Sequence, residues 1–311
     1  MATDLPHRRS AVLLALVALA AIGIPGCAPG NAEAKLLRTS CDGGDAGACN
    51  KFAVKLQKGE YVLRDVPHAA TLFERSCTAG NGDACANLGA LLQRGNGKAV
   101  KKDSAHALAL FQQACEKKAM DGCARLGILY KDGAGLPRDP VRAAALFQQS
   151  CDGDNLLGCT QLAALYSSGE GVTQDFTTAA ALFRKACDAK MQGGCVGLGR
   201  LHLAGTGVPQ SDSISGALFK KACYSREPVG CYDLAMAYES GRGVVQSYWQ
   251  AADLYRQACD DRNAEACAHV AAMYEKGSIR KDQKRADEYK ARACQYGRKE
   301  SCPKPAAKAA S

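Results

Sequence analysis

Cysteine is the residue type whose number and spacing in this sequence could support chemistry. Seventeen cysteines occur among 311 residues, which indicates either metal sites in a reducing compartment or disulfides in an oxidising one. Sixteen of them form eight pairs, each with seven residues between its two members. The pairs are Cys41/Cys49, Cys77/Cys85, Cys115/Cys123, Cys151/Cys159, Cys187/Cys195, Cys223/Cys231, Cys259/Cys267 and Cys294/Cys302.

The spacing within these pairs favours disulfides over metal binding. A structural zinc site typically has cysteines about two to four residues apart, or histidines gathered near them, and the sequence has neither pattern. The five histidines are scattered, without a His-Glu-x-x-His motif. We therefore expect a disulfide within each pair, although spacing alone does not fix connectivity. We expect no metal and no cofactor.

Serine-hydrolase chemistry has little support. A β-lactamase-type site needs a serine one helical turn before a lysine, together with Ser-Asp-Asn and Lys-Thr-Gly motifs. Two Ser-x-x-Lys strings occur, starting at Ser278 and Ser301, but neither partner motif does. The first string falls in an expected turn, and the second spans a paired cysteine and a proline. We therefore assign no catalytic residue.

The remaining cysteine, Cys27, follows an apolar run in the N-terminal region. Basic residues 7–9 precede the run Ala11–Ile24, which is too short for a comfortable membrane span and is typical of a secretory signal. The ending Gly26-Cys27 resembles a bacterial lipoprotein signal, in which the cysteine is lipidated. This resemblance implies an outer-membrane lipoprotein facing the periplasm or the exterior. The alternative is cleavage after the Ala-x-Ala pattern at Ala32–Ala34, which would give a secreted periplasmic protein.

The elements that must position the cysteines recur along the chain. Successive pairs start 35 to 38 residues apart, and a period of this size is typical of a solenoid. After Cys123, Leu126 and Leu129 lie on one face of a predicted helix. Glycines end this helix, and Asp139 then caps a second helix that continues to Cys151. The same cap position holds Asp65, Asp103, Asp175, Ser211, Ser247 and Asp282 in the other repeats.

The sequence therefore predicts an all-α fold, an α/α superhelical solenoid of about seven helix-turn-helix repeats stapled by disulfides. Its expected organisation is a lipoprotein signal peptide at 1–26, a tether at 27–35, the solenoid at 36–302 and a disordered basic tail at 303–311. Each disulfide would close a small loop and contribute about 2–3 kcal/mol.

The recurring pattern AxxLFxxAC…ACxxLGxLYxxGxG resembles the cysteine-rich branch of Sel-1-like repeat proteins, which are relatives of the tetratricopeptide solenoids. The resemblance covers nearly all of 36–302. It implies a right-handed superhelix with a concave face and one disulfide per repeat, in an exported bacterial protein. It also implies a protein-binding scaffold, although part of this branch carries the label cysteine-rich β-lactamase or penicillin-binding protein.

A ladder of varied residues along the first helices is the candidate binding surface. These helices are expected to line the concave face, and a stripe beside their core positions carries polar side chains that differ between repeats. We expect a protein or peptide partner at Asn87, Arg125, Gln161, Arg200 and Asp233. Replacing Arg125 and Arg200 should then weaken partner capture without lowering stability. Simple solvent exposure explains the same variation about as well.

Three functions remain open from the sequence. The favoured one is an envelope scaffold for a protein or peptide partner, held at the membrane only by its lipid anchor. The alternatives are a penicillin-binding or weakly β-lactam-hydrolysing protein, and a peptidoglycan-associated structural lipoprotein. Nucleic-acid binding is not expected, because the net charge of +9 comes from basic residues scattered among acidic ones.

Overall fold

A computed structural model describes residues 29–97 and 99–302 of the chain. These residues form two compact units. The first unit comprises residues 29–81 and the described residues of 96–101. The second unit comprises residues 82–95 and 102–302. Each unit is built from α-helices, and the described residues contain no β-strand longer than a single bridge.

The first unit holds three helices. They are α1 (Pro29–Asp42), α2 (Ala46–Lys58) and α3 (Val66–Thr78). The tether expected at 27–35 is described from Pro29 onward, and there it is the first half of α1 rather than a separate segment. The expected signal peptide at 1–26, Cys27 and the expected tail at 303–311 lie outside the described residues.

The second unit holds six consecutive helix pairs and a short 3-10 helix. Its helices are α4 (Gly82–Arg94), α5 (Ser104–Glu116), α6 (Met120–Asp132), α7 (Pro140–Asp152), α8 (Leu156–Ser168), α9 (Phe176–Asp188), α10 (Gln192–Ala204), α11 (Asp212–Tyr224), α12 (Pro228–Ser240), α13 (Tyr248–Asp260), α14 (Ala264–Lys276), α15 (Gln283–Gln295) and η1 (Lys299–Ser301). With α2 and α3 in the first unit, the described residues contain the seven helix pairs that the sequence predicts.

Each helix pair follows from the same local rules. The side chain of Asp139 accepts a hydrogen bond from the backbone N–H of Arg142 and so caps α7, and the other six predicted cap residues also cap second helices. The first helix α6 ends at Gly133, whose φ of 68° is left-handed and suits glycine. These start and stop signals explain why the helices have one repeated length.

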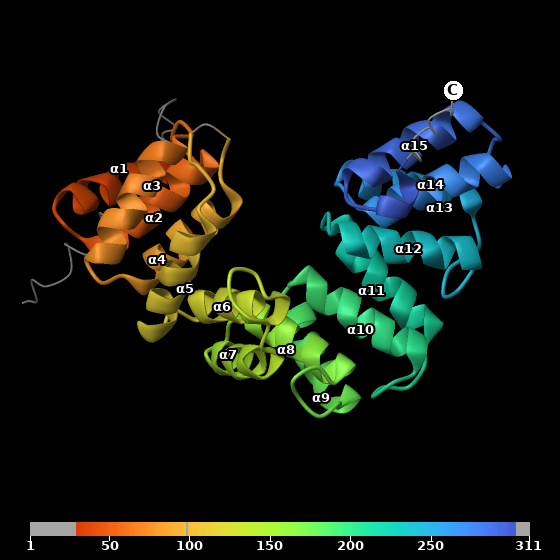
Figure 1. The fold of residues 1–311 in the computed structure, drawn as a ribbon, viewed down its shortest axis with the longest axis horizontal. Coiled ribbons are helices and arrows are strands. Elements are labelled where there is room, and N and C mark those ends of the chain that lie inside the picture. The colour runs from red at the N-terminus through yellow and green to blue at the C-terminus, as the bar shows by residue number, and fades with distance from the viewer. Residues whose placement is uncertain (1–28, 98, 303–311) are drawn as a thin grey trace, which may run out of the picture. The chain divides into compact units, whose positions relative to one another are not determined.

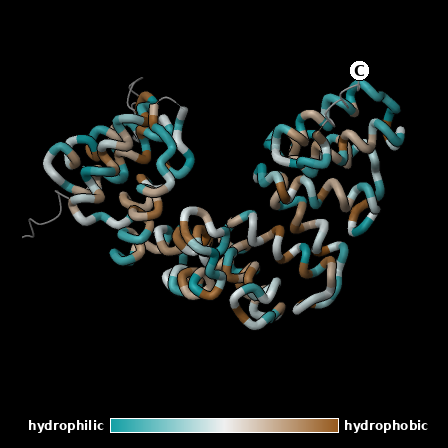
Figure 2. The backbone as a smooth tube through the Cα atoms, viewed as in Figure 1, coloured by the Kyte–Doolittle hydropathy of each residue, from teal (hydrophilic) through white to brown (hydrophobic). Residues whose placement is uncertain are grey.

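The core of each repeat lies where the two helices of a pair meet. Phe147 of α7 is fully buried, and a Cβ atom added to Gly127 of α6 would lie 2.6 Å from its ring. The glycine therefore lets the second helix approach closely. Hydrophobic positions recur along the helices among hydrophilic ones (Figure 2), which matches a narrow buried stripe on each helix.

Seven of the expected disulfides are present in the structure. They are Cys41–Cys49, Cys115–Cys123, Cys151–Cys159, Cys187–Cys195, Cys223–Cys231, Cys259–Cys267 and Cys294–Cys302. Six of them join the end of one helix to the start of the next, and the last joins α15 to the residue after η1. Cys77 and Cys85 belong to different compact units, and their pairing stays a prediction.

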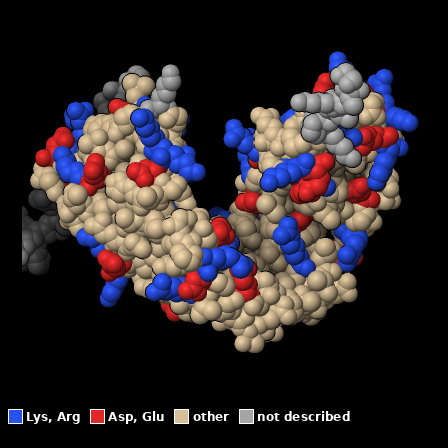
Figure 3. Space-filling model, in the orientation of Figure 1, with Lys and Arg blue, Asp and Glu red and all other residues tan. Residues whose placement is uncertain are grey.

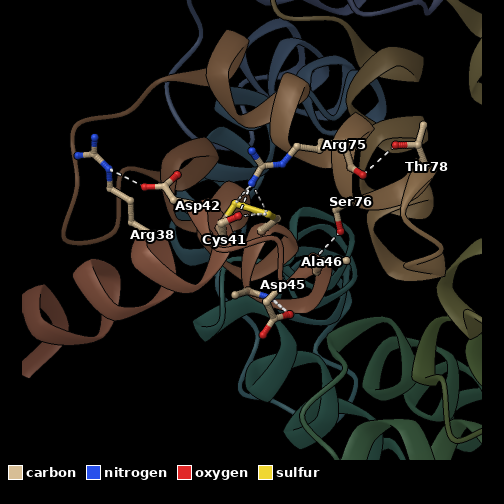
Figure 4. The surroundings of a disulfide bond; sticks show 10 residues. Arg38, Cys41, Asp42, Asp45, Ala46, Arg75, Ser76 and Thr78 are labelled. Carbon is tan, nitrogen blue, oxygen red and sulfur yellow. Dashed lines mark hydrogen bonds and ion pairs between the residues drawn. A yellow bond between two sulfur atoms is a disulfide. The ribbon is translucent and has the colours of Figure 1, made fainter.

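A basic side chain from the following repeat covers several of these junctions. In Figure 4, Arg75 of α3 reaches the Cys41–Cys49 disulfide, and its Nη2 donates to the Cys41 carbonyl at 2.5 Å. Lys221 makes the equivalent contact with the Cys187 carbonyl at 3.1 Å, and Arg292 with the Cys259 carbonyl at 3.3 Å. A cation at these carbonyls satisfies acceptors that the helix C-terminus leaves unpaired.

Within the second unit, the first helices of successive pairs form one layer. Contacts join α4 to α6, α6 to α8, α8 to α10 and α10 to α12, whereas the second helices of neighbouring pairs make no comparable contacts. The first helices therefore lie closer together, on the inner side of the curve. This layer carries the ladder of varied residues.

Candidate functional site

A hollow of about 550 Å³ in the second unit is lined by residues of α10, α11, α12 and α14. Most of the surface of its walls is apolar, although four of its eleven lining residues are charged. A largely apolar surface with placed polar groups is common in ligand sites. The lining residues are Arg200, Leu203, Phe219, Tyr232, Asp233, Met236, Ala237, Glu239, Ser240, Arg242 and His269.

Two of the predicted partner-binding residues meet in this hollow. Arg200 of α10 donates to Asp233 of α12 through both Nε, at 2.7 Å, and Nη2, at 3.0 Å. The side chain of Asp233 is only 9% exposed, whereas that of Arg200 is 54% exposed. Burial raises the pKa of Asp233, and the hydrogen bonds from Arg200 act against that rise. The bidentate pair fixes the plane of the guanidinium group at the wall of the hollow.

Tyr255 of α13 supplies a buried hydroxyl beside the hollow. The equivalent position holds phenylalanine in five other second helices, from Phe73 to Phe219. The Tyr255 ring is fully buried, and its hydroxyl donates to Oε2 of Glu239 at 2.8 Å. Burial, followed by this hydrogen bond, raises the pKa of Tyr255 well above its ordinary value. Tyr255 is therefore a neutral donor that holds the Glu239 carboxylate in place.

His269 of α14 completes the cluster. Its ring stacks on Tyr255 with centroids 4.8 Å apart, and its Nε2 lies 3.1 Å from the Tyr232 hydroxyl. Nδ1 of His269 is 3.7 Å from Oε2 of Glu239. Burial lowers the pKa of His269 below its ordinary value, although Glu239 opposes this effect. The imidazole is therefore neutral at pH 7, and the Glu239 charge remains without a cationic partner on this side.

A smaller hollow of about 210 Å³ adjoins the first one. Glu239 and His269 line both, and the second also contacts Lys276, Ser278 and Arg298. Arg298 is already paired with Glu265 at 2.5 Å. The two hollows therefore lie next to each other, with Glu239 and His269 between them.

The other predicted partner-binding residues lie outside both hollows. Arg125 pairs with Asp121 of its own helix at 2.5 Å, and Gln161 accepts a hydrogen bond from Lys131 at 2.9 Å. Asn87 is half-buried on α4. The structure thus brings together Arg200 and Asp233 and separates them from the rest of the ladder.

Four residues of the polar cluster beside Arg200 and Asp233 are missing from the sequence prediction. Tyr232, Glu239, Tyr255 and His269 are not among the predicted partner-binding residues. Two signals were available in the sequence. Tyr255 is a tyrosine where five other repeats have phenylalanine, and Tyr232 is an aromatic residue where the others have smaller side chains.

From the sequence we expect no catalytic residue and no metal site. Ser278 lies in the loop between α14 and α15, and Ser301 lies in η1. No group of three or more histidine, cysteine or acidic residues within the described ranges could hold a metal ion.

Among the same residues, no helix is long and apolar enough to cross a membrane. On the face drawn in Figure 3, Lys and Arg lie among Asp and Glu.

The fold resembles several solved structures. A protective antigen of uropathogenic Escherichia coli strains that displays an SLR fold aligns over 86% of this chain and 57% of its own, with 25% identity and a TM-score of 0.58. A Sel1 repeat protein from Oxalobacter formigenes aligns over 86% of this chain and 77% of its own, with 23% identity and a TM-score of 0.59. This chain therefore spans little more than half of the E. coli antigen.

Immunity protein Pa5087 from Pseudomonas aeruginosa also shares the fold, with 19% identity and a TM-score of 0.51 over 69% of this chain and 81% of its own. A comparison with curated proteins found no match. Seven stretches match the Sel1 repeat, at residues 47–81, 82–118, 121–155, 156–191, 194–225, 228–263 and 264–295. Because these stretches cover most of the sequence, the chain belongs to the Sel1 repeat family, whose members are scaffolds that generally bind protein partners.

Proposed function

We propose that this protein is an exported scaffold that binds an extended segment of a protein partner along the inner surface of α10, α12 and α14. The observation that supports this proposal is the hollow of about 550 Å³ between these helices. Its apolar walls would release water when a partner side chain enters, which is the main source of affinity at such sites.

The arrangement of polar groups supports a peptide partner further. The Arg200–Asp233 pair and the Tyr255–Glu239 hydrogen bond hold side chains in fixed positions before a ligand arrives. Such preorganisation lowers the entropy cost of binding. The adjoining smaller hollow gives neighbouring residues of the same segment a place to lie. In this proposal Arg200 and Asp233 contact the partner segment at the hollow, and Asn87, Arg125 and Gln161 contact it further along the same layer.

Selection from a random peptide display library tests this proposal. Met236→Asp places a charge on the apolar wall and should abolish the enrichment of peptides. Ile214→Asp is a matched control, because Ile214 is exposed to a similar extent, 46% against 43%, but lies outside the hollow. Equal enrichment on the wild type and on Met236→Asp would contradict the proposal.

We also propose that Cys27 carries a lipid anchor in an outer-membrane lipoprotein. The disulfides support an oxidising, exported environment, since they persist in such compartments and are rare in the cytosol. Intact-mass measurement of the mature protein should show a chain that begins at Cys27 with a lipid adduct. A mature chain that begins at Lys35 would instead establish ordinary signal-peptidase cleavage.

The penicillin-binding and peptidoglycan functions are not favoured. The two serines of the Ser-x-x-Lys strings lie in a loop and in a short 3-10 helix. The sequence contains neither the Ser-Asp-Asn nor the Lys-Thr-Gly motif that a β-lactamase-type site needs. Labelling with a fluorescent penicillin and sedimentation with peptidoglycan are expected to give no signal above that of an unrelated lipoprotein.

A further inference from the structure

We infer that the hollow between α10, α12 and α14 recognises a lysine or arginine side chain of the bound segment. This inference rests on the proposed function and specifies the chemistry of the partner. The site combines apolar and aromatic walls with one carboxylate that lacks a basic partner. This combination fits a side chain with an apolar stem and a positively charged end.

Aromatic rings from three helices form part of the walls. Phe219 comes from α11, Tyr232 from α12 and His269 from α14. A cation is attracted to the face of an aromatic ring, and the attraction grows when water is excluded. Tyr232 is particular to this repeat, because the equivalent residues in the other first helices are smaller. They are Asn50, Ala86, Ala124, Thr160, Val196 and Ala268.

Among the charged residues that line the hollow, Glu239 alone has no lysine or arginine at ion-pairing distance within the described part of the chain. Arg200 is paired with Asp233 at 2.7 Å, and Arg242 is paired with Asp212 at 2.8 Å. Among the contacts described for it, the Glu239 carboxylate accepts a hydrogen bond from the neutral Tyr255 hydroxyl. The neutral imidazole of His269 lies 3.7 Å away, beyond hydrogen-bond distance.

Two further basic residues share only the smaller hollow with Glu239. Lys276 and Arg298 line the smaller hollow, and Arg298 is held by Glu265. The larger hollow therefore presents the Glu239 charge to whatever enters it. A neutral side chain would leave that charge partly desolvated without compensation, whereas a lysine or arginine would neutralise it.

Tyr255 positions Glu239 for this role. Its hydroxyl donates at 2.8 Å to one carboxylate oxygen and so restricts the side chain. The phenylalanine found at this position in five other repeats could not make this bond. The two tyrosines that depart from the repeat pattern therefore contribute to the same feature, one as a wall and one as a support for the carboxylate.

A titration with single amino-acid derivatives tests the inference. Amide resonances of the isotope-labelled protein would be followed by NMR while N-acetyl-lysine amide or N-acetyl-norleucine amide is added. Norleucine has the same apolar stem without the charge. We expect lysine amide to shift resonances of α12 and α14 and to bind about tenfold more tightly than norleucine amide.

Two variants and a control make the test specific. Glu239→Gln should reduce the preference for lysine to about twofold, because it removes the charge but keeps the shape. Tyr232→Ala, which introduces the residue found in other repeats, should weaken lysine binding while the fold is kept. Glu288→Gln on α15 removes an exposed carboxylate elsewhere and should change nothing.

Three results would overturn the inference. They are equal binding of norleucine amide, a lysine preference that survives Glu239→Gln, and no binding of either probe where library peptides do bind. In each case the peptide-binding proposal would stand if library peptides still depend on Met236. Failure of the library selection itself would instead remove the proposed function.

Discussion

The α6–α7 repeat and the α12–α13 repeat share a framework but differ in what they bury. Phe147 and Tyr255 occupy the same position of the second helix and are both fully buried. The phenylalanine packs against Gly127 of its first helix and leaves no polar group to satisfy. The tyrosine brings a hydroxyl that is satisfied by Glu239. One repeat thus has an apolar core, and the other places a supported carboxylate on the inner surface.

The two regions also use arginine differently. Arg125 of α6 pairs with Asp121 one turn away on the same helix, whereas Arg200 pairs with Asp233 of the next repeat. The first arrangement touches only one helix, and the second joins two neighbouring first helices at the hollow. Capping residues, glycines and cysteines therefore keep the framework the same in both repeats, while changes at a few inner positions create a site.

Removal of a disulfide tests whether the framework is equal in the two regions. Each of the double variants Cys151→Ala/Cys159→Ala and Cys259→Ala/Cys267→Ala should lower the free energy of unfolding by about 2.5 kcal/mol, because both bonds close loops of the same length. Urea unfolding measures the change. A loss of stability in only one of the two variants would show that the two disulfides do not stabilise their repeats equally.

Removal of the arginines should separate the two regions. Arg200→Met leaves the nearly buried Asp233 carboxylate without its partner and should cost about 2 kcal/mol of stability. Arg125→Met breaks a partly exposed pair within one helix and should cost about 0.5 kcal/mol or less. From the sequence alone we expect no loss of stability on replacing Arg200, whereas the nearly buried Asp233 carboxylate predicts one. Similar costs for both variants in urea unfolding would remove the distinction.

Exchange of the aromatic residues gives a smaller effect. Tyr255→Phe removes the donor to Glu239, and Phe147→Tyr buries a hydroxyl in an apolar core, so each should cost about 1 kcal/mol. Thermal unfolding monitored by circular dichroism would detect both changes. A neutral Phe147→Tyr exchange would mean that the α6–α7 repeat can accommodate a polar group as readily as the α12–α13 repeat.

The smallest effect concerns pH. Because burial lowers the pKa of His269 in the folded state, the unfolded chain binds more protons than the folded one below the ordinary pKa of histidine. Stability should be unaffected by His269 above about pH 6.5 and should fall as the pH decreases below it. His269→Gln should remove this part of the slope.

Asp233 has the opposite effect on stability in more acidic solution. Burial raises its pKa, so the folded state there binds more protons than the unfolded chain. The difference between the wild type and His269→Gln therefore isolates the histidine. Unfolding measured at intervals between about pH 5 and pH 8 tests this prediction. Parallel curves for the two proteins would contradict it.

The framework could be predicted from the sequence because it depends on local signals. Asp139 caps its helix through a neighbour three residues away, and Cys151 pairs with a cysteine eight residues away. The site depends on contacts between repeats. Arg200 and Asp233 are 33 residues apart, and the ladder places them side by side only when the packing of the first helices is known. Tyr255 resembled its phenylalanine equivalents in the pattern, so its hydroxyl was overlooked.

Hydrogen–deuterium exchange of the protein with a library-selected peptide tests the central claim most directly. If the inner surface of the C-terminal repeats is the binding site, the peptide should slow exchange in α10, α12 and α14 and leave α4, α6 and α8 unchanged. Protection centred on α4 to α8, or on the second helices α11 and α13 alone, would contradict the account.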